Sequence, residues 1–487
     1  MASYTANQLN GAGTPIEALT ANTEVTFILK RPLDYLSGSA YFTVETVRNG
    51  DGFYDATLPT NALGVYGIDT GLESTKGLIT SSYISSVVVQ PTSNSTSSYT
   101  FIPTSNISVS SSMLRATGGI SLEIAGLGGP YAFVTKAGLQ TAVDLWISDR
   151  AAALGTYGEI NTWNVSVITN MSDLFFNKTT FNNDISNWDV SNVTNMQNMF
   201  NGASSFDADI TIWDVSNVTN MSSMFIGATA FNRNIGAWNV SQVENMSQMF
   251  NGATSFNQSL NSWDVSSVTT MQNMFNGASS LNGGVMIWDV SSVTNMIGMF
   301  NGATAFNRNI NAWDVSNVTN MDFMFQGAQS FNQDLNSWDV SSVIDMRAMF
   351  DGATIFNGNI IGWDVSSVTD MQGMFAFSNG FNRDIGTWDV SNVTDMGDMF
   401  NNASSFNQDI SSWNVSNVTD MSTMFNSSGL STTNYDLLLN EWSALTVQPN
   451  VPFGAGTVQY SVGTPTTSRG VLTSAPNNWT ITDGGQV

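Results

Sequence analysis

Tryptophan recurs every 25 residues through the central part of this chain. The eleven positions are Trp163, Trp188, Trp213, Trp238, Trp263, Trp288, Trp313, Trp338, Trp363, Trp388 and Trp413. Other apolar residues keep the same period, among them the columns that contain Val190, Met196 and Phe200. A fixed period of about 20–50 residues is typical of a solenoid, in which each unit buries its apolar face against its neighbours. The pattern therefore predicts eleven stacked repeats over residues 158–430, with all of these tryptophans buried.

Each repeat begins with a pattern that predicts a short β-strand. The apolar residues of Ile185-x-x-Trp188-x-Val190 have the L-x-x-L-x-L spacing of the strand in leucine-rich repeats. We expect these three side chains to point inward and Asn187 and Asp189 to point outward. Successive repeats would then pair at these strands as one parallel ladder, with rungs roughly 4.8 Å apart.

The second part of each repeat predicts a short helix or helical turn. Thr194 stands where it can cap such an element, and Gly202 suits its end. The inward face would carry the apolar side chains Met196, Met199, Phe200 and Ala203.

Two flanking segments are expected to cap the repeats. Residues 135–153 have apolar residues at helical spacing, and Thr135 stands at the N-cap position. An end repeat otherwise exposes its core. We therefore predict a helical N-terminal cap over residues 129–157 and a C-terminal cap over residues 431–487.

Residues 1–128 have a different character. Short apolar runs broken by Gly, Ser, Asn and Pro predict strands at residues 23–30, 40–47, 82–89, 99–102 and 121–124. Strands this short, at this spacing, favour an all-β domain. The predicted fold class is thus mainly β with short helices: an N-terminal all-β domain, then a leucine-rich-repeat-like solenoid of eleven repeats between two caps.

Charge and composition narrow the possible functions. The chain has 13 basic and 38 acidic residues and a net charge of −25, which disfavours binding to nucleic acid or to anionic membranes. It has no Cys and no His, which excludes disulfides, His/Cys zinc sites and a Ser-His-Asp triad within the chain. The N-terminus lacks the pattern of a signal peptide, and no run approaches the roughly 20 apolar residues that span a bilayer. We expect no membrane insertion.

The motif WDVSNVTNMSSMF resembles the bacterial surface-protein repeat of about 25 residues, within the BspA-like group of leucine-rich repeats. The resemblance covers roughly residues 134–487. The flanking segments AVDLWISDRAAALGTYGEINTWNVS and NYDLLLNEWSALTVQPNVPFGAGTVQYS, with the later WTITDGG, are similar to those of the family as well. The resemblance implies a surface or adhesion-type protein of bacteria or their viruses, not an enzyme. Residues 1–128 resemble structural proteins of tailed phages in general style.

The residue after most of the repeat tryptophans is an aspartate, which makes an acidic column. Its members are Asp189, Asp214, Asp264, Asp289, Asp314, Asp339, Asp364 and Asp389, and Asn fills the other three places. On a strand face they would form an outward-facing ladder able to hold Ca²⁺ or to meet the hydroxyls of a glycan. Ca²⁺, however, takes about 6–8 oxygen ligands, which this edge does not supply. The alternative, Asx-type hydrogen bonding to nearby backbone N–H groups, fits the exchange of Asp for Asn.

The sequence therefore predicts a non-enzymatic protein with no catalytic residues, no cofactor and no metal. Identical repeats give carboxylates identical environments, whereas general acid–base catalysis needs two that differ. The favoured hypothesis is an exterior virion protein of a bacteriophage. Residues 1–128 would bind other virion proteins, and the solenoid would face a host-surface glycan or protein. A bacterial cell-surface adhesin and an intracellular interaction scaffold are the alternatives.

Overall fold

The computed structural model describes eight strands within residues 1–128, and residues 131–285 and 287–487. The chain forms two compact units. One comprises residues 1–132 together with residues 151–163, and the other comprises residues 133–150 together with residues 164–487.

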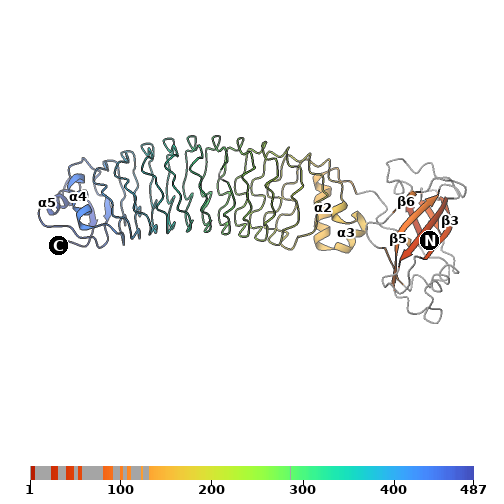
Figure 1. Cartoon of the computed structure of the whole chain (residues 1–487). Helices are drawn as coiled ribbons and strands as arrows, with labels where there is room; N and C mark the ends of the chain where they lie inside the picture. The colour runs from red at the N-terminus through yellow and green to blue at the C-terminus, as the bar shows by residue number, and fades with distance from the viewer. Residues whose placement is uncertain are drawn as a thin grey trace. The chain divides into compact units, whose positions relative to one another are not determined.

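The first unit contains an eight-stranded sheet (Figure 1). Its strands are β1 (Ala2–Thr5), β2 (Thr23–Lys30), β3 (Ala40–Arg48), β4 (Phe53–Ala56), β5 (Ser81–Gln90), β6 (Tyr99–Phe101), β7 (Ile107–Ser110) and β8 (Leu122–Glu123). The order is β6-β5-β2-β3-β4-β1-β8, with β7 also paired to β5. All pairs are antiparallel except β1 with β8.

Five of these strands lie where the sequence predicts them. Those are β2, β3, β5, β6 and β8. β1, β4 and β7 were not predicted, and each has only four residues, too few for an alternating pattern to be read. Ile102, Ser121 and Ile124, at the ends of predicted strands, lie outside the described residues.

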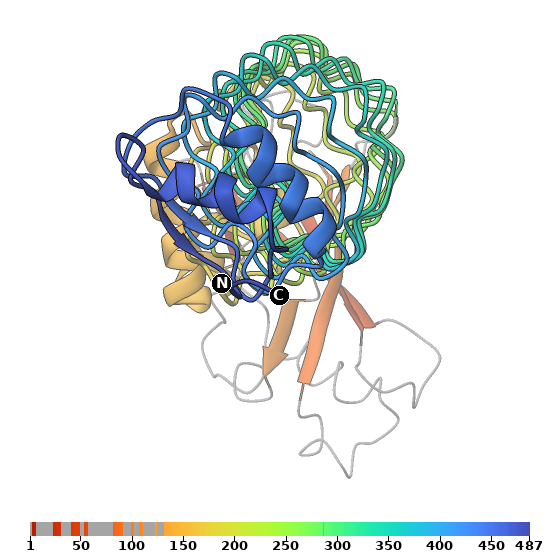
Figure 2. The ribbon, with the colours of Figure 1, turned by 90° about the vertical axis from the view of Figure 1, so that its left-hand side faces the viewer.

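In the second unit the 25-residue repeats stack as successive coils, which nearly superpose when viewed along the stack (Figure 2). Ten parallel bridges join one column of eleven residues in consecutive coils. The column comprises Asn170, Asn195, Asn220, Asn245, Thr270, Asn295, Asn320, Asp345, Asp370, Asp395 and Asp420. All eleven repeat tryptophans are between 1% and 4% exposed, so the prediction that they are buried is confirmed.

Backbone N–H groups on this side of the coil alternate between two kinds of partner. Those of Met196, Asn198, Phe200 and Gly202 donate to carbonyls of the next coil, 24 residues ahead, at 2.7–3.0 Å. Those of Met199, Asn201 and Ala203 donate to the carbonyl three residues back in the same coil, at 3.0–3.1 Å. Each coil is therefore closed by turns and bound to its neighbour by a ladder.

Of the short helix or helical turn predicted around Thr194–Ala203, the helix is not formed, because residues 197–202 are turns and Thr194 caps no helix. Asn198 has φ 55° and Gly202 has φ 74°, whereas a right-handed helix requires negative φ throughout. The left-handed residues send alternate N–H groups out of the coil, where they meet the next coil. Nor does Gly202 end a helix. Its column packs glycine on glycine, and a Cβ at Gly252 would lie 3.6 Å from the Cα of Gly227.

The parallel pairing predicted for the strand at Ile185-x-x-Trp188-x-Val190 is also wrong. These residues point inward as expected and are at most 3% exposed, but they form no ladder. A side chain supplies the link between coils instead. The indole N–H of Trp213 donates to the carbonyl of Ile185 in the preceding coil at 3.2 Å, and the same bond recurs from Trp238 to Ile210 at 3.1 Å. The same carbonyl also accepts the backbone N–H of Trp188 in its own coil, at 3.1 Å.

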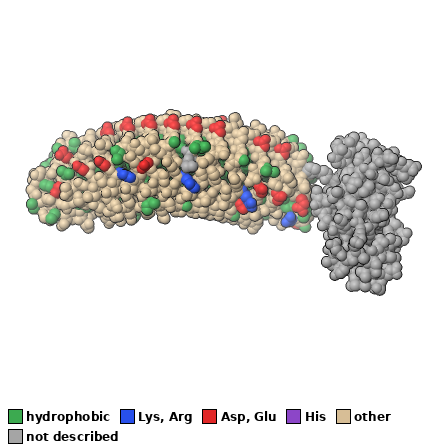
Figure 3. Space-filling view, in the orientation of Figure 1, with side chains coloured by type: hydrophobic (Ala, Val, Ile, Leu, Met, Phe, Trp, Pro, Cys, Tyr) green, Lys and Arg blue, Asp and Glu red, His purple; other side chains and the backbone are tan. Residues whose placement is uncertain are grey.

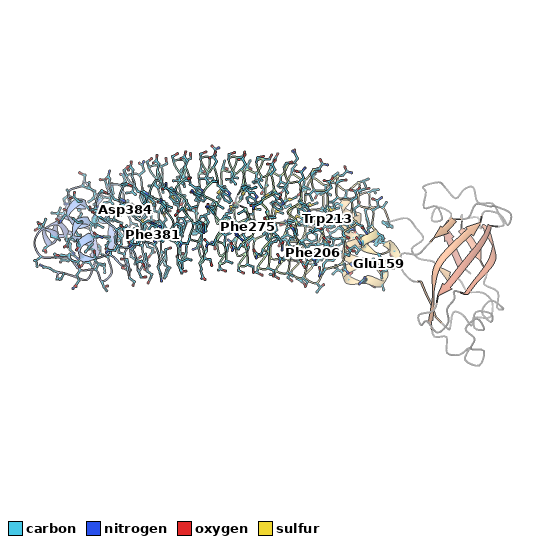
Figure 4. All side chains as sticks on the ribbon, viewed as in Figure 1. Glu159, Phe206, Trp213, Phe275, Phe381 and Asp384 are labelled. Carbon is cyan, nitrogen blue, oxygen red and sulfur yellow. The ribbon has the colours of Figure 1, made fainter. Side chains whose placement is uncertain are left out.

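The core is a set of aromatic columns that follow the stack. Phe200 stacks on Phe206 within its own coil at 3.8 Å between ring centroids, and on Phe225 of the next coil at 5.6 Å. Trp288 and Trp313 stack at 6.1 Å. Figure 4 shows members of these columns inside the stack. Nearly every coil thus buries the same types of side chain in the same places, with exceptions such as Leu281 in the column of Phe206, and neighbouring coils share one continuous interior.

Helix α2 (Lys136–Ser148) covers the first coil of this unit, and Thr135 caps it by accepting from the Gly138 N–H at 3.1 Å. Its apolar face, which includes Val143 and Trp146, is buried. The Trp146 indole donates to Asn183 at 3.0 Å. Helix α3 (Arg150–Tyr157) and the 3₁₀ turn η5 (Ile160–Thr162) follow, so the single predicted helix is two.

At the other end, residues 431–487 continue the ladder and then close it. They contain α4 (Thr432–Trp442), β9 (Pro452–Gly454), α5 (Thr464–Thr473) and β10 (Thr480–Thr482). β9 bridges to the last coil at Met421, and β10 pairs in parallel with β9. The last carbonyls and N–H groups of the ladder therefore have partners in this segment.

Substitution of one core tryptophan tests this packing. Trp313→Ala should destabilise the protein by about 3–5 kcal/mol, because it leaves a cavity between Trp288 and Trp338 and removes the indole bond to Val285. Trp313→Phe keeps a ring and loses the N–H, and should cost about 1–3 kcal/mol. Denaturant unfolding measures both. Equal costs for the two variants would mean that the cavity does not cause most of the lost stability.

Candidate functional site

The predicted acidic column lies on the surface. All eight aspartates, Asp189, Asp214, Asp264, Asp289, Asp314, Asp339, Asp364 and Asp389, are exposed. They face outward as expected, but they do not stand on a strand, so the predicted strand face is wrong. Figure 3 shows acidic side chains following one another along one edge of the stack.

Each of these carboxylates is fixed by its own backbone. In all eight, Oδ1 accepts from the N–H of the serine two residues later, at 3.0–3.1 Å. In several, including Asp264 and Asp314, the serine hydroxyl also donates, at 2.6 Å. These hydroxyl bonds, with the backbone bond, lower the pKa of Asp214, Asp264, Asp314 and Asp364. This is the Asx-type arrangement that the exchange of Asp for Asn indicates.

Shallow depressions lie beside this column. One, of about 430 Å³, is lined by Ala312, Asp314 and Asp339 among others. Another, of about 540 Å³, is lined by Ala237, Ser262 and Asp264 among others. Among residues 131–285 and 287–487 no three carboxylates lie close enough to hold a metal ion together. The exposed column is thus a regular surface of separate, locally anchored carboxylates.

A second acidic column follows the ladder itself. The column of bridged residues is Asn or Thr up to Asn320, and then Asp345, Asp370, Asp395 and Asp420, all half-buried. Burial raises the pKa of Asp395, and the charges of Asp370 and Asp420 above and below it act in the same direction. Asp395 is therefore shifted in the opposite direction to Asp214, Asp264, Asp314 and Asp364 of the exposed column.

The most perturbed carboxyl of this region is Asp322. Burial, and then the hydrogen bond and negative charge of Asp345, raise the pKa of Asp322 to about 7. The Arg347 guanidinium lies 3.7 Å from Asp322 Oδ2, and the backbone N–H of Arg347 donates to Asp322 Oδ1 at 3.0 Å. Asp322 is 4% exposed, which places it in the packing between coils and out of reach of a substrate.

Next to this pair the surface is hollowed into a groove of about 470 Å³. The groove is lined by Phe323, Arg347, Ala348, Asp351, Gln372, Gly373, Ala376, Phe377, Asp398 and Asn401. We call it the Phe323–Phe377 groove. It crosses four consecutive coils, and its floor is the hydrogen-bonded ladder. The small residues Ala348 and Gly373 form its centre.

Both aromatic residues of the groove break the repeat. Phe377 stands in the column that is glycine from Gly202 to Gly352, and it keeps the left-handed backbone, with φ 55°. Phe323, at φ 56°, stands in a column that holds Asn198 and other small or polar residues. A bulky residue at positive φ is strained, and such strain concentrates at functional sites. The sequence prediction missed these residues, although a search for breaks in the invariant columns would have found Phe377.

The carboxylates of the groove are held by neutral donors. Asp351 accepts from the Gln326 amide at 2.8 Å, and Asp398 accepts from the Asn401 amide at 2.8 Å and from the Thr423 hydroxyl. Burial raises the pKa of Asp351, and the negative charge of Asp398 acts in the same direction. Arg347 is engaged elsewhere, since it pairs with Asp322 and its guanidinium lies 4.9 Å from the ring centroid of Phe323.

Stability should depend on pH through Asp322. A carboxyl with a folded-state pKa near 7 and an ordinary unfolded pKa contributes stability that is complete below about pH 4 and is lost as pH rises through about 7. Asp322→Asn keeps the Oδ1 acceptor. It should therefore raise the free energy of unfolding at pH 8 by about 1 kcal/mol or more, and change it little at pH 4.

Thermal unfolding between pH 4 and pH 8 checks this expectation. Asp314→Asn is the matched control, because hydrogen bonds lower the pKa of that exposed carboxyl and its effect should have the opposite sign and be small. A parallel pH profile for Asp322→Asn and the wild type would show that Asp322 does not titrate in this range.

The repeats match a known protein family. The family described as "Mycoplasma protein of unknown function, DUF285" matches residues 149–263, 254–361 and 333–442. No curated protein and no solved structure matches the chain significantly. The family is related to the BspA-like repeats. Its three matches together cover more than half of the chain, and the chain therefore belongs to the DUF285 family.

Proposed function

We propose that this chain is a non-enzymatic surface-display protein, namely an exterior virion protein of a bacteriophage. The observation that carries the proposal is the repeated outer surface: exposed carboxylates at the same place in successive coils, each anchored by its own backbone, over an invariant core. Residues 155–430 hold 24 acidic and 5 basic residues. Such a surface resists self-association and suits weak, repeated contacts.

We also propose that the stack is a leucine-rich-repeat-like solenoid with a helical N-terminal cap over residues 129–157 and a C-terminal cap over residues 431–487. One turn per 25 residues and bonds only between adjacent coils support this class. The ladder is made by turns, not by the leucine-rich-repeat strand. In this proposal residues 1–128, with their eight-stranded sheet, are an all-β domain that attaches to other virion proteins.

The described carboxylates support a role without catalysis. Asp214, Asp264, Asp314 and Asp364 have a lowered pKa for the same local reason, and Asp322, the one shifted to about 7, is buried against Arg347. No helix among the described residues is both long enough and apolar enough to cross a bilayer.

A bacterial cell-surface adhesin is the second candidate, and the family match favours it, because the family is described from Mycoplasma. It would use the same outer surface towards a glycan or a protein. An intracellular interaction scaffold is the third. The three differ in where the chain is found, so location is the property to measure.

Particle binding tests the proposed division of labour. We expect the tagged full chain to co-sediment with phage particles that lack this protein, and a chain without residues 1–128 to stay in the supernatant. A chain lacking residues 301–325, one complete repeat, is the matched control and should pellet like the full chain. If the chain without residues 1–128 pellets equally well, attachment lies in the repeats. If no form pellets and the protein fractionates with the bacterial envelope, the adhesin assignment replaces the virion assignment.

A further inference from the structure

The outer surface departs from the repeat at the Phe323–Phe377 groove. From Gly202 to Gly352 the left-handed position of this column is a glycine in every coil, and Asn177, Asn402 and Ser427 fill its other places. At Phe377 a phenyl ring projects instead and is 49% exposed. The neighbouring residues change as well, since Ala376-Phe377-Ser378 stands where each coil from Gly202 to Gly352 has Asn, Ile, Gln or Asp followed by Gly-Ala. At this coil three adjacent residues depart from the repeat, and Ala376 and Phe377 line the groove.

The electrostatics of the groove favour a cation. Asp351 and Asp398 line the same hollow, and the negative charge of Asp398 adds to burial in raising the pKa of Asp351. Their hydrogen-bond donors are amides and a hydroxyl, which carry no charge. The one basic residue that lines the groove, Arg347, already faces Asp322 and Phe323. A cationic group of a ligand would therefore find two carboxylates without a neutralising partner.

The aromatic rings favour a cation of the same kind. The guanidinium of Arg347 lies 4.9 Å from the centroid of Phe323, which is the geometry of a cation–π contact. Among the described residues no Lys or Arg occupies the corresponding place over Phe377. The ring of Phe377 is thus open to a cation–π contact with a ligand, of the kind that the ring of Phe323 makes with Arg347. The surrounding repeats, with 24 acidic and 5 basic residues, attract cations to the groove and repel anionic ligands.

We propose that the Phe323–Phe377 groove binds a basic peptide segment of a partner protein, with an Arg or Lys side chain over the ring of Phe377 and against the carboxylates of Asp351 and Asp398. The proposal deepens the display function and rests on it, because the stack must be free to meet a partner. A neutral oligosaccharide, which would use the rings and amides but not the carboxylates, is the competing occupant.

Binding of a defined peptide to the full chain tests this proposal. The probe is a fluorescent heptapeptide with two arginines among glycines and serines, and its counterpart has citrulline, a neutral isostere, in place of arginine. We expect the arginine peptide to bind at least tenfold more tightly than the citrulline peptide. Phe377→Gly, which restores the residue of the repeat and leaves the net charge unchanged, should weaken binding about tenfold, as should Asp351→Asn.

Two variants serve as controls, and folding of all variants is checked by thermal unfolding. Asn177→Gly makes the same kind of change in the same left-handed column, far along the chain from the groove, and should leave binding unchanged. Asp189→Asn removes one charge from the exposed acidic column and should change binding by less than twofold. Phe377→Gly should unfold at the same or a higher temperature than the wild type, since glycine suits φ 55°.

Three results would overturn the proposal. Equal binding to Phe377→Gly and the wild type would mean that the acidic surface attracts the peptide without the groove. Equal affinities for the citrulline peptide and the arginine peptide would mean that the positive charge of the ligand does not contribute to binding. Binding of maltohexaose that Phe377→Gly abolishes, without binding of the arginine peptide, would assign the groove to a neutral glycan. None of these results bears on the particle-binding assay, so failure of the groove proposal and failure of the display proposal are separable.

Discussion

The structure of the repeat unit depends on one constraint: alternate backbone N–H groups must leave the coil and bond to the next one. Residues such as Met196, Phe200 and Gly202 meet it, and their donors reach carbonyls 24 residues ahead. That geometry requires left-handed backbone at two places in each coil, those of Asn198 and Gly202. It also fixes the repeat length, because one extra residue would shift every bond that follows. The uniform columns of Trp, Met and Phe are the packing consequence of this register.

The same constraint explains which parts of the fold the sequence predicts. Period, repeat number and inward side chains follow from the spacing of Trp188 and its equivalents, and their burial agrees. The backbone conformation of the repeat cannot be predicted from that spacing. The run from Met196 to Ala203 has apolar residues at i, i+3 and i+4, which a helix and a chain of turns place inward equally well. Recurrent Gly at position 202, together with Asn at 198, was the available sign of left-handed backbone.

One part of the candidate site can be predicted from the sequence and another part cannot. The exposed column from Asp189 to Asp389 is predictable because the repeat itself creates it, and its hydrogen bonds are local. The Phe323–Phe377 groove is not predictable from the consensus, because it consists of departures from the consensus in different coils. Residues 323, 347 and 377 are distant in the sequence, and only the register of the coils makes them line one hollow. Individual exceptions to a repeat therefore carry more functional information than its invariant positions.

Closure of the ladder by β9 and β10 has an evolutionary consequence. The terminal segment takes up the bonds of the last coil at Met421, and it meets the same backbone groups that any coil presents. Coils can therefore be gained or lost by in-frame duplication or deletion of 75 bases without remaking either end. Each event would change the reach of the protein by roughly 4.8 Å and its charge by that of one unit. The length of the stack can therefore change in steps of one repeat while both terminal segments stay the same.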